Sequence, residues 1–443
     1  MFGTSGIRGP VGEDVTADLA LAVGRALAVD ADRVVVGRDP RESGQFLADA
    51  AAAGLRECGA DVVRLGVAAT PTVARSVDPL EADAGVAVTA SHNPPTDNGL
   101  KLWQPSGQAF DERRRDAIAD RVRGESFEPA PWDDLGRQSG GEGARERHAG
   151  AIVDAVGGND APLADLSVAV DLGNGAGAVS VDALSELGAS VETLNAQPDG
   201  GFPGRPSEPT AENCKSLRAL VSAGSFDLGI AHDGDADRML AVTGEGTWVP
   251  GDVLLALFAR EAVSEGKQVA VPVDTSLAVA DAVAAAGGSV VRTRVGDVYV
   301  AERASEAGVV FGGEPSGAWI WPGETLCPDG PLAAAKLAAL VADRGPLSDL
   351  VGSVDTYPIR RTSLEVEDKR AVMERVADRV GETYDDVTTL DGVRVDLGEA
   401  WFLVRASGTQ PLVRVTAEAR DDGRADSAFE EASALVEDAI DAR

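Results

Sequence analysis

The chain has 443 residues, several times the ~100–200 residues of a typical domain, and 44% of them are hydrophobic. Such a chain has enough apolar material for several hydrophobic cores. Its 73 acidic residues against 40 cationic residues give a formal net charge of -33. A surface of that sign repels nucleic acids and anionic membranes, so neither is an expected partner.

The cationic residues are unusual in kind, because only five of the 40 are lysine. This composition favours a halophilic protein that stays soluble in concentrated salt, where the Debye length falls to ~3 Å at 1 M, over an ordinary acidic cytosolic protein. The three cysteines form neither a disulfide framework nor a CxxC metal site. No signal peptide is evident, and no apolar run approaches the ~18 residues of a membrane span. We therefore expect a cytoplasmic protein.

Three stretches of the chain repeat one pattern of elements. Each has an apolar first strand, an Ala/Leu-rich helix, a second strand that opens with glycine, and a third strand that runs into a polar loop. The first strands are predicted at 33–37, 167–171 and 268–272, the second at 59–63, 188–192 and 287–291, and the third at 85–89, 227–231 and 308–312. This alternation indicates mostly parallel sheets, whose ligands bind beyond the carboxyl ends of the strands. We therefore expect the three polar loops to face one cleft.

The pattern changes at two further places along the chain. Residues 124–150 are rich in Gly, Glu, Pro and Arg, which is typical of a linker. Beyond Gly352 the sequence predicts a strand, a charged helix, a hairpin near 391–392, two more strands and a closing helix, which together indicate a smaller α+β domain. The predicted domains are 1–140, 145–246, 247–351 and 352–443.

The first polar loop is Thr89-Ala-Ser-His-Asn-Pro94, with Ser91 directly after an apolar strand. A hydroxyl there can stand at the rim of a sheet, but the G-x-S-x-G motif of a hydrolase nucleophile is missing. Adjacent side chains of an extended segment point to opposite faces, so His92 is poorly placed as a base for Ser91. These residues alone favour a nucleophile no more than a capping serine before a turn.

The second polar loop spans residues 232–238, and its three carboxylates, Asp233, Asp235 and Asp237, stand at alternate positions. Oxygen ligands of this kind suit Mg²⁺. In so acidic a chain the spacing can also arise by chance, so the position of the loop matters more than the pattern. Three carboxylates after a buried strand repel one another unless a cation neutralises them. This favours a metal site over a solvated acidic turn.

Two further loops supply groups that suit a phosphorylated sugar. Residues 312–317, Gly-Gly-Glu-Pro-Ser-Gly, combine a flexible backbone with a carboxylate and a hydroxyl that suit sugar hydroxyls, although a simple turn would use the same residues. Residues 405–411, Arg-Ala-Ser-Gly-Thr-Gln-Pro, gather a guanidinium, two hydroxyls and a glycine that frees backbone N–H groups for a phosphate. The phosphate interpretation is favoured because the rest of the chain repels anions.

One motif indicates a different function. Residues 173–178, Gly-Asn-Gly-Ala-Gly-Ala, follow a strand and precede a helix, and Glu192 lies about 20 residues further on, as in a dinucleotide-binding fingerprint. An NAD-dependent dehydrogenase is therefore an alternative. Against it, the same block ends on the Asp cluster, which a dehydrogenase does not need.

In their order along the chain, the four polar loops resemble those of the α-D-phosphohexomutase family, from Gly3 into the C-terminal domain. Residues 4–9, Thr-Ser-Gly-Ile-Arg-Gly, and residues 98–101, Asn-Gly-Leu-Lys, also match the family. The resemblance implies three similar α/β domains with mixed sheets and a smaller C-terminal α+β domain around a central cleft. It also implies a mutase that interconverts hexose 6-phosphate and hexose 1-phosphate through a phosphoserine enzyme and a bisphosphate intermediate.

The resemblance gives the transfer residues their expected roles. Ser91 would carry the phosphate, and one Mg²⁺ per chain would be held by that phosphate and by the three aspartates of the second loop. Arg8 and Lys101 match family positions beside the phosphoserine, where they would act as catalytic residues by stabilising charge or managing the proton. Lys101 is one of only five lysines, and a perturbable amine would be useful there.

The resemblance also gives the hexose phosphate a binding site. Its phosphate would bind to four residues of the last loop, Arg405, Ser407, Gly408 and Thr409. Glu314 and Ser316 would bind the sugar hydroxyls in either orientation of the substrate. Arg238, beside the Asp cluster, is a further cation expected to help capture an anionic substrate in an acidic chain.

Three shorter segments indicate which sugar the protein prefers, because each resembles a particular subgroup of the family. Residues 295–300, Val-Gly-Asp-Val-Tyr-Val, and 313–320, Gly-Glu-Pro-Ser-Gly-Ala-Trp-Ile, look most like phosphoglucosamine mutases, particularly archaeal ones, so the expected reaction converts glucosamine 6-phosphate to glucosamine 1-phosphate. Residues 401–405 resemble archaeal phosphoglucomutase/phosphomannomutases, which stand as the alternative. Ala318 stands where several family members have a histidine, so this chain lacks the sugar contact expected from that histidine. A non-catalytic sugar-phosphate sensor on the same fold is the third hypothesis.

Overall fold

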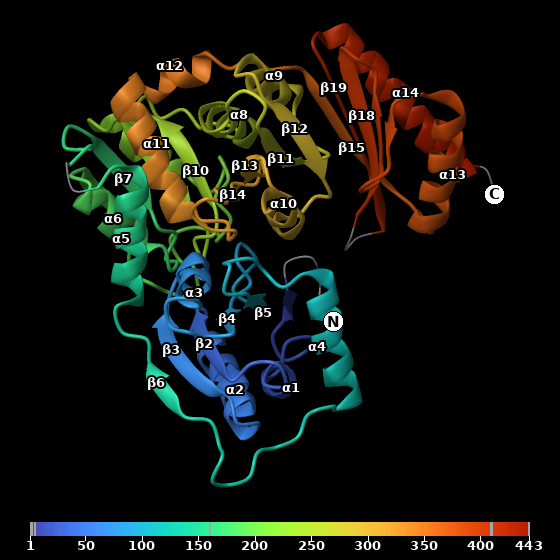
Figure 1. Ribbon diagram of the computed structural model, residues 1–443. Helices are drawn as coiled ribbons and strands as arrows, with labels where there is room; N and C mark the ends of the chain where they lie inside the picture. Colours follow the sequence, from blue (N-terminus) through green and yellow to red (C-terminus); the bar gives the residue numbers. More distant parts are fainter. Residues whose placement is uncertain (1–2, 4–5, 159–160, 408–410, 442–443) are drawn as a thin grey trace.

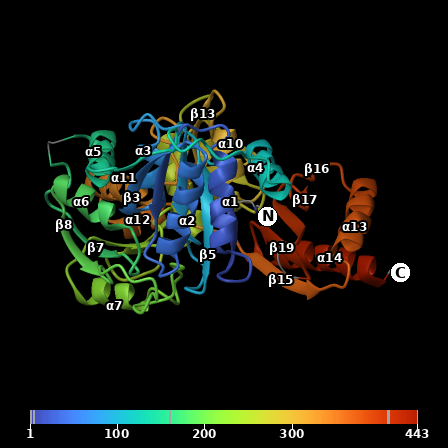
Figure 2. The ribbon, with the colours of Figure 1, turned by 90° about the horizontal axis from the view of Figure 1, so that it is seen from below.

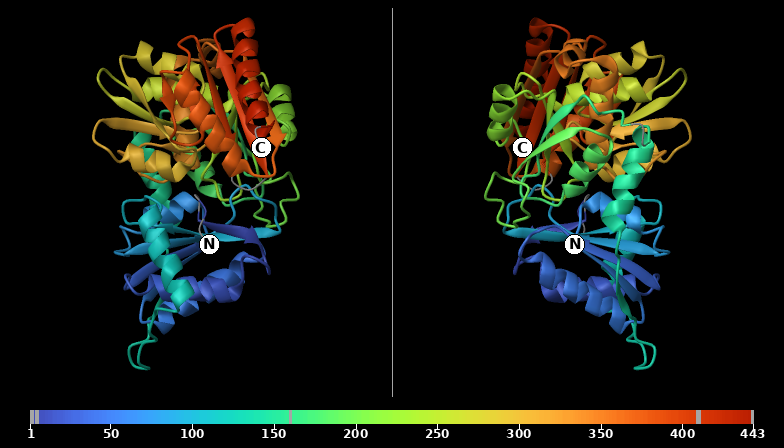
Figure 3. Two further views of the ribbon diagram at one scale, coloured as in Figure 1. Left: turned by 90° about the vertical axis from the view of Figure 1, so that its right-hand side faces the viewer. Right: turned by 90° about the vertical axis from the view of Figure 1, so that its left-hand side faces the viewer.

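A computed structural model of the protein describes residues 3, 6–158, 161–407 and 411–441. Four groups of elements, each built on its own sheet, follow one another along the chain (Figure 1). We name them the first, second, third and C-terminal domains. Side views show the first domain below the other three (Figure 3), and the view from below places the second and C-terminal domains at opposite ends (Figure 2).

The first domain contains a sheet with the strand order β1-β5-β4-β2-β3-β6. Its strands are β1 (Ile7–Pro10), β2 (Arg33–Arg38), β3 (Asp61–Val67), β4 (Ala84–Val88), β5 (Asp97–Trp103) and β6 (Gln138–Gly140). Its helices are α1 (Ala17–Leu27), α2 (Gly44–Glu57), α3 (Thr70–Ser76) and α4 (Glu112–Gly124). Helices α1 and α2 pack closely because Gly24 and Gly54 have no side chain: an added Cβ would lie 2.2 Å from a carbonyl oxygen of the facing helix.

The second and third domains contain sheets with the orders β10-β9-β7-β8 and β12-β11-β13-β14. The second domain consists of α5 (Ala144–Val156), β7 (Ser167–Asp171), α6 (Ala178–Glu186), β8 (Ser190–Leu194), α7 (Lys215–Ala223), β9 (Leu228–His232) and β10 (Met239–Thr243). The third consists of α8 (Gly251–Ala262), β11 (Gln268–Pro272), α9 (Leu277–Ala285), β12 (Ser289–Thr293), α10 (Asp297–Ala304), β13 (Val309–Gly313), β14 (Trp319–Ile320), α11 (Gly330–Arg344) and α12 (Leu347–Gly352).

The three α/β domains share one topology. In each, the first strand of the repeated block pairs in parallel with the second and third strands on either side of it. A further strand then returns antiparallel beside the third strand. The predicted fold class, three similar α/β units with mixed sheets, is therefore confirmed. The loops after β4, β9 and β13 consequently stand at equivalent sheet edges.

The second strand of each block begins two residues later than predicted, at Asp61, Ser190 and Ser289. The glycines assigned to these strands instead end the preceding helices, because Gly59, Gly188 and Gly287 have left-handed φ angles of 94°, 98° and 84°. In all three places the next N–H donates back to a carbonyl of the last helical turn at 3.0 Å. This is the glycine-based helix ending of the Schellman type.

The stretch 124–150, predicted as a linker, holds more regular structure than its composition indicates. It contains β6, which pairs in parallel with the edge strand β3, and the beginning of α5. Strand β6 is polar and exposed along its length, so it has no hydrophobic pattern, and backbone hydrogen bonds hold it in place. The linker prediction was wrong for these residues for that reason.

The C-terminal domain contains an antiparallel sheet with the order β15-β19-β18-β17-β16. Its elements are β15 (Ile359–Glu365), α13 (Lys369–Thr383), β16 (Val387–Thr388), β17 (Val393–Asp396), β18 (Ala400–Ala406), β19 (Leu412–Ala419) and α14 (Asp422–Asp441). The two helices cover one face of the sheet over a separate core. On the other face, Trp401 and Leu403 pack against Val273 and Leu277 of the third domain. The predicted α+β domain is confirmed.

The hydrophobic cores show how the domains are joined. One continuous cluster runs through the second and third domains, whereas most of the first domain packs around a cluster of its own. Helix α11 of the third domain packs against α5 and α6 of the second, which extends the shared core. No helix in the described ranges has the length and apolarity needed to cross a membrane.

Candidate active site

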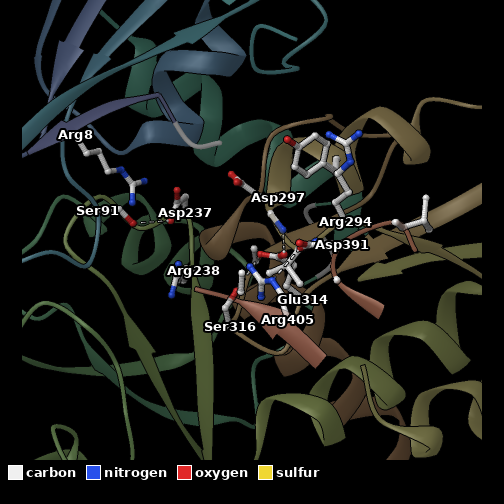
Figure 4. Close-up of a pocket in the computed structure, with 17 residues that line it drawn as sticks. Arg8, Ser91, Asp237, Arg238, Arg294, Asp297, Glu314, Ser316, Asp391 and Arg405 are labelled. Atoms are coloured by element: carbon white, nitrogen blue, oxygen red, sulfur yellow. Dashed lines mark hydrogen bonds and ion pairs between the residues drawn. The ribbon is translucent and has the colours of Figure 1, made fainter. Parts of the chain in front are cut away.

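The four polar loops meet at one cavity of about 650 Å³. Its wall includes Ser91 from the first domain, Asp237 from the second, Glu314 from the third and Arg405 from the C-terminal domain. Figure 4 shows Ser91 and Asp237 on one side of this group, and Arg405 near Glu314 and away from Ser91. The expectation that the loops face one cleft is met, and a fourth loop joins them.

Ser91 lies at the turn after β4 with a left-handed φ of 52° and only 1% of its surface exposed. Its Oγ donates to Asp233 Oδ2 at 2.6 Å, across the boundary between the first and second domains. Its own N–H donates to Thr89 Oγ1 at 2.8 Å, which holds the turn. The serine hydroxyl thus points at the carboxylate cluster rather than capping a helix.

The three carboxylates of the second loop form one buried group whose ligand atoms lie within 4.8 Å of one another. Thr70 Oγ1 donates to Asp235 Oδ2 at 2.6 Å, but Asp235 Oδ1 is buried and has no hydrogen-bond partner. A buried oxygen without a partner, next to two further carboxylates and a serine oxygen, is a donor set that suits a hard divalent cation. These residues therefore fit Mg²⁺.

The electrostatics of the cluster are uneven. Burial, followed by the charges of Asp237 and Asp235, raises the pKa of Asp233 well above its ordinary value. Burial acts in the same direction on Asp235, but the charge of Lys101 and the hydrogen bond from Thr70 outweigh it and lower the pKa of Asp235. The charge of Arg238 lowers the pKa of Asp233 but does not outweigh burial and the two neighbouring carboxylates, so Asp233, which faces Ser91, is the less compensated carboxylate of this pair.

Lys101 lies in β5, where its Nζ donates to Asp235 Oδ2 at 3.1 Å and also to Asp237. Burial alone would lower the pKa of Lys101, but the charges of Asp235 and Asp237 outweigh burial and raise the pKa above its ordinary value. In this arrangement Lys101 is a fixed cation. The expectation of a readily perturbed amine does not fit that environment.

Arg8 and His92 flank the serine. Arg8 comes from β1, lines the cavity, and has a buried Nε without a hydrogen-bond partner. His92 Nδ1 stands 3.5 Å from Ser91 Oγ, which is too long for a good hydrogen bond. Burial, with a smaller contribution from the charge of Arg238, lowers the pKa of His92 to about 2, so its ring is neutral. The prediction that His92 is poorly placed as a base agrees with this geometry.

The third loop forms a compact turn at the middle of the cavity. Glu314 accepts from the Gly296 N–H at 2.7 Å and from Ser316 Oγ at 3.2 Å, so both of its oxygens are used. Burial and the charge of Asp297 raise the pKa of Glu314 to about 7. Ala318 also lines the cavity, and its small side chain leaves open the space a histidine would take.

The fourth loop is held from two sides. Arg405 lines the cavity and forms an ion pair with Asp391 at 3.1 Å. The Ser407 carbonyl accepts from Lys369 Nζ at 2.6 Å. Gly408 and Thr409, which the sequence assigns to the phosphate site, lie outside the described residues.

Comparisons with known proteins agree with this geometry over the whole chain. Models of the phosphoglucomutase/phosphomannomutase family match in four parts: α/β/α domain I at residues 1–129, domain II at 147–246, domain III at 250–357 and the C-terminal domain at 362–435. The chain belongs to the phosphoglucomutase/phosphomannomutase family.

Relatives and solved structures place the chain within this family. It is 47% identical to a "Probable phosphoglucosamine mutase" from Methanopyrus kandleri, over 96% of this chain and 95% of that protein. It is 43% identical to one from Methanococcoides burtonii, over 99% of both chains. A phosphoglucomutase/phosphomannomutase family protein from Burkholderia thailandensis has a similar structure, with a TM-score of 0.86 and 28% identity over 99% of this chain and 98% of that one.

Family membership and packing together remove the dehydrogenase alternative. The glycines of residues 173–178 serve close packing: an added Cβ on Gly173 would lie 2.7 Å from the Arg205 guanidinium, and one on Gly175 would lie 2.7 Å from the Gly234 carbonyl. The Ala176 N–H also donates to that carbonyl at 3.0 Å. The loop therefore supports the second polar loop, residues 232–238, which we call the metal loop after its predicted role, instead of forming a fingerprint for a dinucleotide.

Sequence reasoning missed several residues of the cavity wall. Arg294, Asp297 and Asp391 line it, although no site role was predicted for any of them. Asp297 opens α10, and Asp391 belongs to the hairpin predicted near that position. Their position on the wall depends on how the C-terminal domain sits against the third, so a local pattern gave no signal.

Proposed function

We propose that this phosphohexomutase interconverts a hexose 6-phosphate and a hexose 1-phosphate, with glucosamine phosphate as the preferred substrate. The observation that carries the proposal is one cavity that joins a buried serine beside a carboxylate cluster to a cationic loop on the opposite wall. Relatives at 40–47% identity are named as phosphoglucosamine mutases, which supports the choice of sugar.

We propose that Mg²⁺ is the cofactor, held by Asp233, Asp235 and Asp237 together with a phosphate on Ser91. When bound, it would neutralise charge on the transferring phosphoryl group. The unpartnered oxygen of Asp235 and the 2.6 Å contact of Ser91 with Asp233 support this assignment.

Ser91 would carry the phosphate between two half-reactions. In the first, the bond from phosphorus to Ser91 Oγ breaks as phosphorus bonds to the free hydroxyl of the substrate, and the proton of that hydroxyl passes to Ser91 Oγ. The product of this step is a hexose bisphosphate. It turns over in the cavity and returns its other phosphate to Ser91 Oγ, so phosphate and proton balance over the cycle.

The cations around the cavity divide between its two ends. Arg8 and Lys101 stand at the transfer end and would stabilise charge on the phosphoryl group. Arg238 lines the same end, where the charges of Asp233 and Asp237 outweigh burial and raise its pKa. At the other end, Arg405 would bind the phosphate that is not transferred. Ser407, Gly408 and Thr409 complete that site in our proposal, with Glu314 and Ser316 binding the sugar between the ends.

We further infer that the protein works in the cytoplasm of a salt-adapted cell. The net charge of -33, the scarcity of lysine and the free state of all three cysteines support this inference. We expect activity and native circular dichroism to be lost on dialysis into low salt. Full stability in low salt would contradict the salt adaptation.

A coupled assay tests the substrate. We would follow the formation of sugar 1-phosphate from the 6-phosphates of glucosamine, glucose and mannose, in high salt with Mg²⁺. We expect the highest kcat/KM on glucosamine 6-phosphate. Faster turnover of mannose or glucose phosphate would instead assign the protein as a phosphomannomutase or phosphoglucomutase.

Intact-protein mass spectrometry tests the phosphoserine. After incubation with a hexose bisphosphate, the wild-type protein should carry one phosphate, and Ser91→Ala should carry none and show no turnover. A non-catalytic sensor would remain unphosphorylated and inactive on every sugar phosphate. Turnover by Ser91→Ala would defeat the assignment of Ser91.

A further inference from the structure

A segment of the second domain, residues 199–207, lies across the Ser91 loop of the first domain. We call it the crossing segment. It packs against the backbone at Arg41, since an added Cβ on Gly200 would lie 2.4 Å from the Arg41 Cα. The Phe202 ring lies 4.9 Å from the Arg41 guanidinium carbon. Ser207 Oγ then donates to the Ser91 carbonyl at 2.8 Å.

Arg41 is fully buried, and both terminal nitrogens of its guanidinium group donate to the Ser91 loop, which we define as residues 89–97. Its Nε donates to Asp39 Oδ2 at 2.9 Å, and the same aspartate accepts from Thr89 Oγ1 at 2.7 Å. The two terminal nitrogens donate to four carbonyls of the loop, those of Ser91, Asn93, Pro94 and Asp97. A planar guanidinium group has five N–H donors and can hold several carbonyls in place at once, which the single ammonium group of a lysine cannot do.

Arg205 repeats this arrangement on the metal loop. It is buried in the crossing segment and ion-paired with Asp171 at 2.7 Å. Its Nη2 donates to the His232 carbonyl at 2.6 Å, directly before the first metal-loop aspartate. Its Nη1 donates to the carbonyls of Pro206 and Ser207, which fixes the crossing segment itself.

The three blocks differ in this feature. Asp39 and Asp171 stand at the carboxyl ends of β2 and β7, the first strands of their blocks, and each is paired with a buried arginine. Asp274 stands beyond the equivalent strand β11, but its Oδ1 is buried and lacks a hydrogen-bond partner. Among the described residues, the paired arrangement is therefore found in the two blocks whose loops meet at Ser91.

We propose that Arg41 and Arg205, joined through Ser207, are positioning residues that keep the Ser91 loop and the metal loop in fixed register. The Ser91 carbonyl receives a hydrogen bond from each side, from Arg41 in its own domain and from Ser207 in the second. Ser91 also holds a left-handed φ, a conformation that costs energy for a non-glycine residue and needs surrounding support. The inference rests on the proposed phosphoserine chemistry.

The reason for such anchoring lies in the charge that Ser91 would carry. Adding a phosphate brings about −1.5 to −2 charges to its Oγ, and each half-reaction removes or restores them. Because the reacting atoms must stay aligned, a misplacement of 1 Å can cost about a hundredfold in rate. In our proposal, Arg41 and Ser207 keep the Ser91 carbonyl in place, and Arg205 keeps the His232 carbonyl in place, when the side-chain charge changes.

Arg41→Lys tests the proposal most directly. We expect kcat to fall about a hundredfold in the fully phosphorylated protein, with KM for the hexose phosphate within about twofold, because substrate phosphate binds at the other end. We also expect faster loss of phosphate from Ser91 to water, followed by intact mass without substrate. A folded, fully phosphorylated Arg41→Lys protein with wild-type kcat and wild-type hydrolysis would overturn the proposal.

If Arg41→Lys does not fold, Ser207→Ala tests the same proposal. Ser76→Ala is the matched control for Ser207→Ala. Each variant removes one buried hydroxyl bond to a carbonyl, of 2.8 Å from Ser207 to Ser91 and of 2.7 Å from Ser76 to Thr72. We expect similar losses of stability but a kcat reduced about fivefold to tenfold in Ser207→Ala alone. Equal kcat values in the two variants would overturn the proposal.

Phosphorylation and turnover of the wild-type protein show whether the proposed function or only this inference has failed. If wild type never acquires phosphate on Ser91 and turns over no hexose phosphate, the proposed function fails and the inference fails with it. If wild type is phosphorylated and active while the Arg41 and Ser207 variants behave like it, the inference alone fails.

Discussion

Ser91, at one end of the cavity, is 1% exposed and receives hydrogen bonds from two domains, whereas Arg405, on the opposite wall, has 27% of its side chain exposed. The Ser91 end is surrounded by buried ion pairs, of Arg41 with Asp39 and of Lys101 with Asp235. The Arg405 end is held by an ion pair to Asp391 that is open to solvent.

This difference matches what each end would do. In the proposed reaction, bonds form and break at Ser91, so the groups there need fixed positions. The Arg405 end would bind a phosphate on either of two carbons of the sugar and release the product, which solvated and adaptable contacts allow. The following predictions test the contrast, beginning at the buried end.

Lys101→Met should have the largest effect on stability. The variant leaves Asp235 and Asp237 buried without their cation, which we expect to lower the free energy of unfolding by ~3–5 kcal/mol in the absence of Mg²⁺. Added Mg²⁺ should restore part of the loss, because in our proposal it binds the folded cluster. Urea denaturation with and without Mg²⁺ measures both effects.

Lys215→Met is the control for this prediction, since Lys215 forms an exposed ion pair with Glu212. We expect it to change stability by no more than about 0.5 kcal/mol. Equal losses in the two lysine variants would contradict the contrast between buried and exposed charges.

Glu314 should give a pH dependence in the middle of the cavity. Its pKa is raised from 4.5 to about 7, so the folded protein binds this proton more tightly than the unfolded chain. The resulting stabilisation is fully present below pH 4.5 and is lost as the pH rises through 7. As the pH rises from 4.5 to above 7, the free energy of unfolding of wild type should fall by ~3 kcal/mol relative to that of Glu314→Gln.

Urea midpoints of wild type and Glu314→Gln between pH 4.5 and 8 check this prediction, because groups common to both proteins cancel. A constant difference between the two proteins across that range would show that Glu314 is ionised throughout. It would also contradict the raised pKa that burial and the charge of Asp297 give Glu314.

Glu418 should affect how the C-terminal domain sits on the third. It is buried in β19 and accepts from Ser276 Oγ, the Leu277 N–H and Trp401 Nε1 at 2.5–2.7 Å, so it caps helix α9 from another domain. Glu418→Gln should lower the free energy of unfolding by ~1.5–3 kcal/mol and raise KM more than it changes kcat.

The control for Glu418 is Glu399→Gln, which removes a solvent-exposed partner of Arg420. We expect ~0–1 kcal/mol and an unchanged KM there. A lower kcat with unchanged KM in Glu418→Gln would show that the junction serves the transfer end instead.

Lys369→Met should have the smallest effect. It removes the bond to the Ser407 carbonyl, and we expect KM for the hexose phosphate to rise about fivefold with kcat nearly unchanged. Arg370→Met, in which the next residue loses an exposed pair with Glu374, should leave KM unchanged. A loss of kcat larger than that of Arg41→Lys would reverse the proposed contrast.

The repeated fold could be predicted because its signals are local. Apolar strands, amphipathic helices and polar loops at strand ends recur in each block, and all three sheets have the expected topology. The strand starts at Gly59, Gly188 and Gly287 were wrong because a left-handed glycine that ends a helix and a glycine that opens a strand have the same sequence. Strand β6 was missed because it has no apolar pattern.

Some residues of the candidate site also had a local sequence signal, whereas others had none. Ser91, Arg405 and the three aspartates stand in distinctive loops, so the order of loops along the chain was enough to find them. Arg41, Arg205 and the crossing segment gave no such signal. Most of the acceptors that the two arginines bind are backbone carbonyls, which any residue type can supply.

The sequence by itself determined which chemical groups this protein has and on which strand ends they stand, because burial patterns and loop composition act over a few neighbouring residues. Only the tertiary structure decided which groups meet. Ser91 and Asp233 are 142 residues apart, and Thr70 and Asp235 are 165 apart, yet each pair shares a hydrogen bond of 2.6 Å. Such contacts depend on how separate domains pack, so the charge state of Lys101 and the anchoring of Ser91 followed from the fold alone.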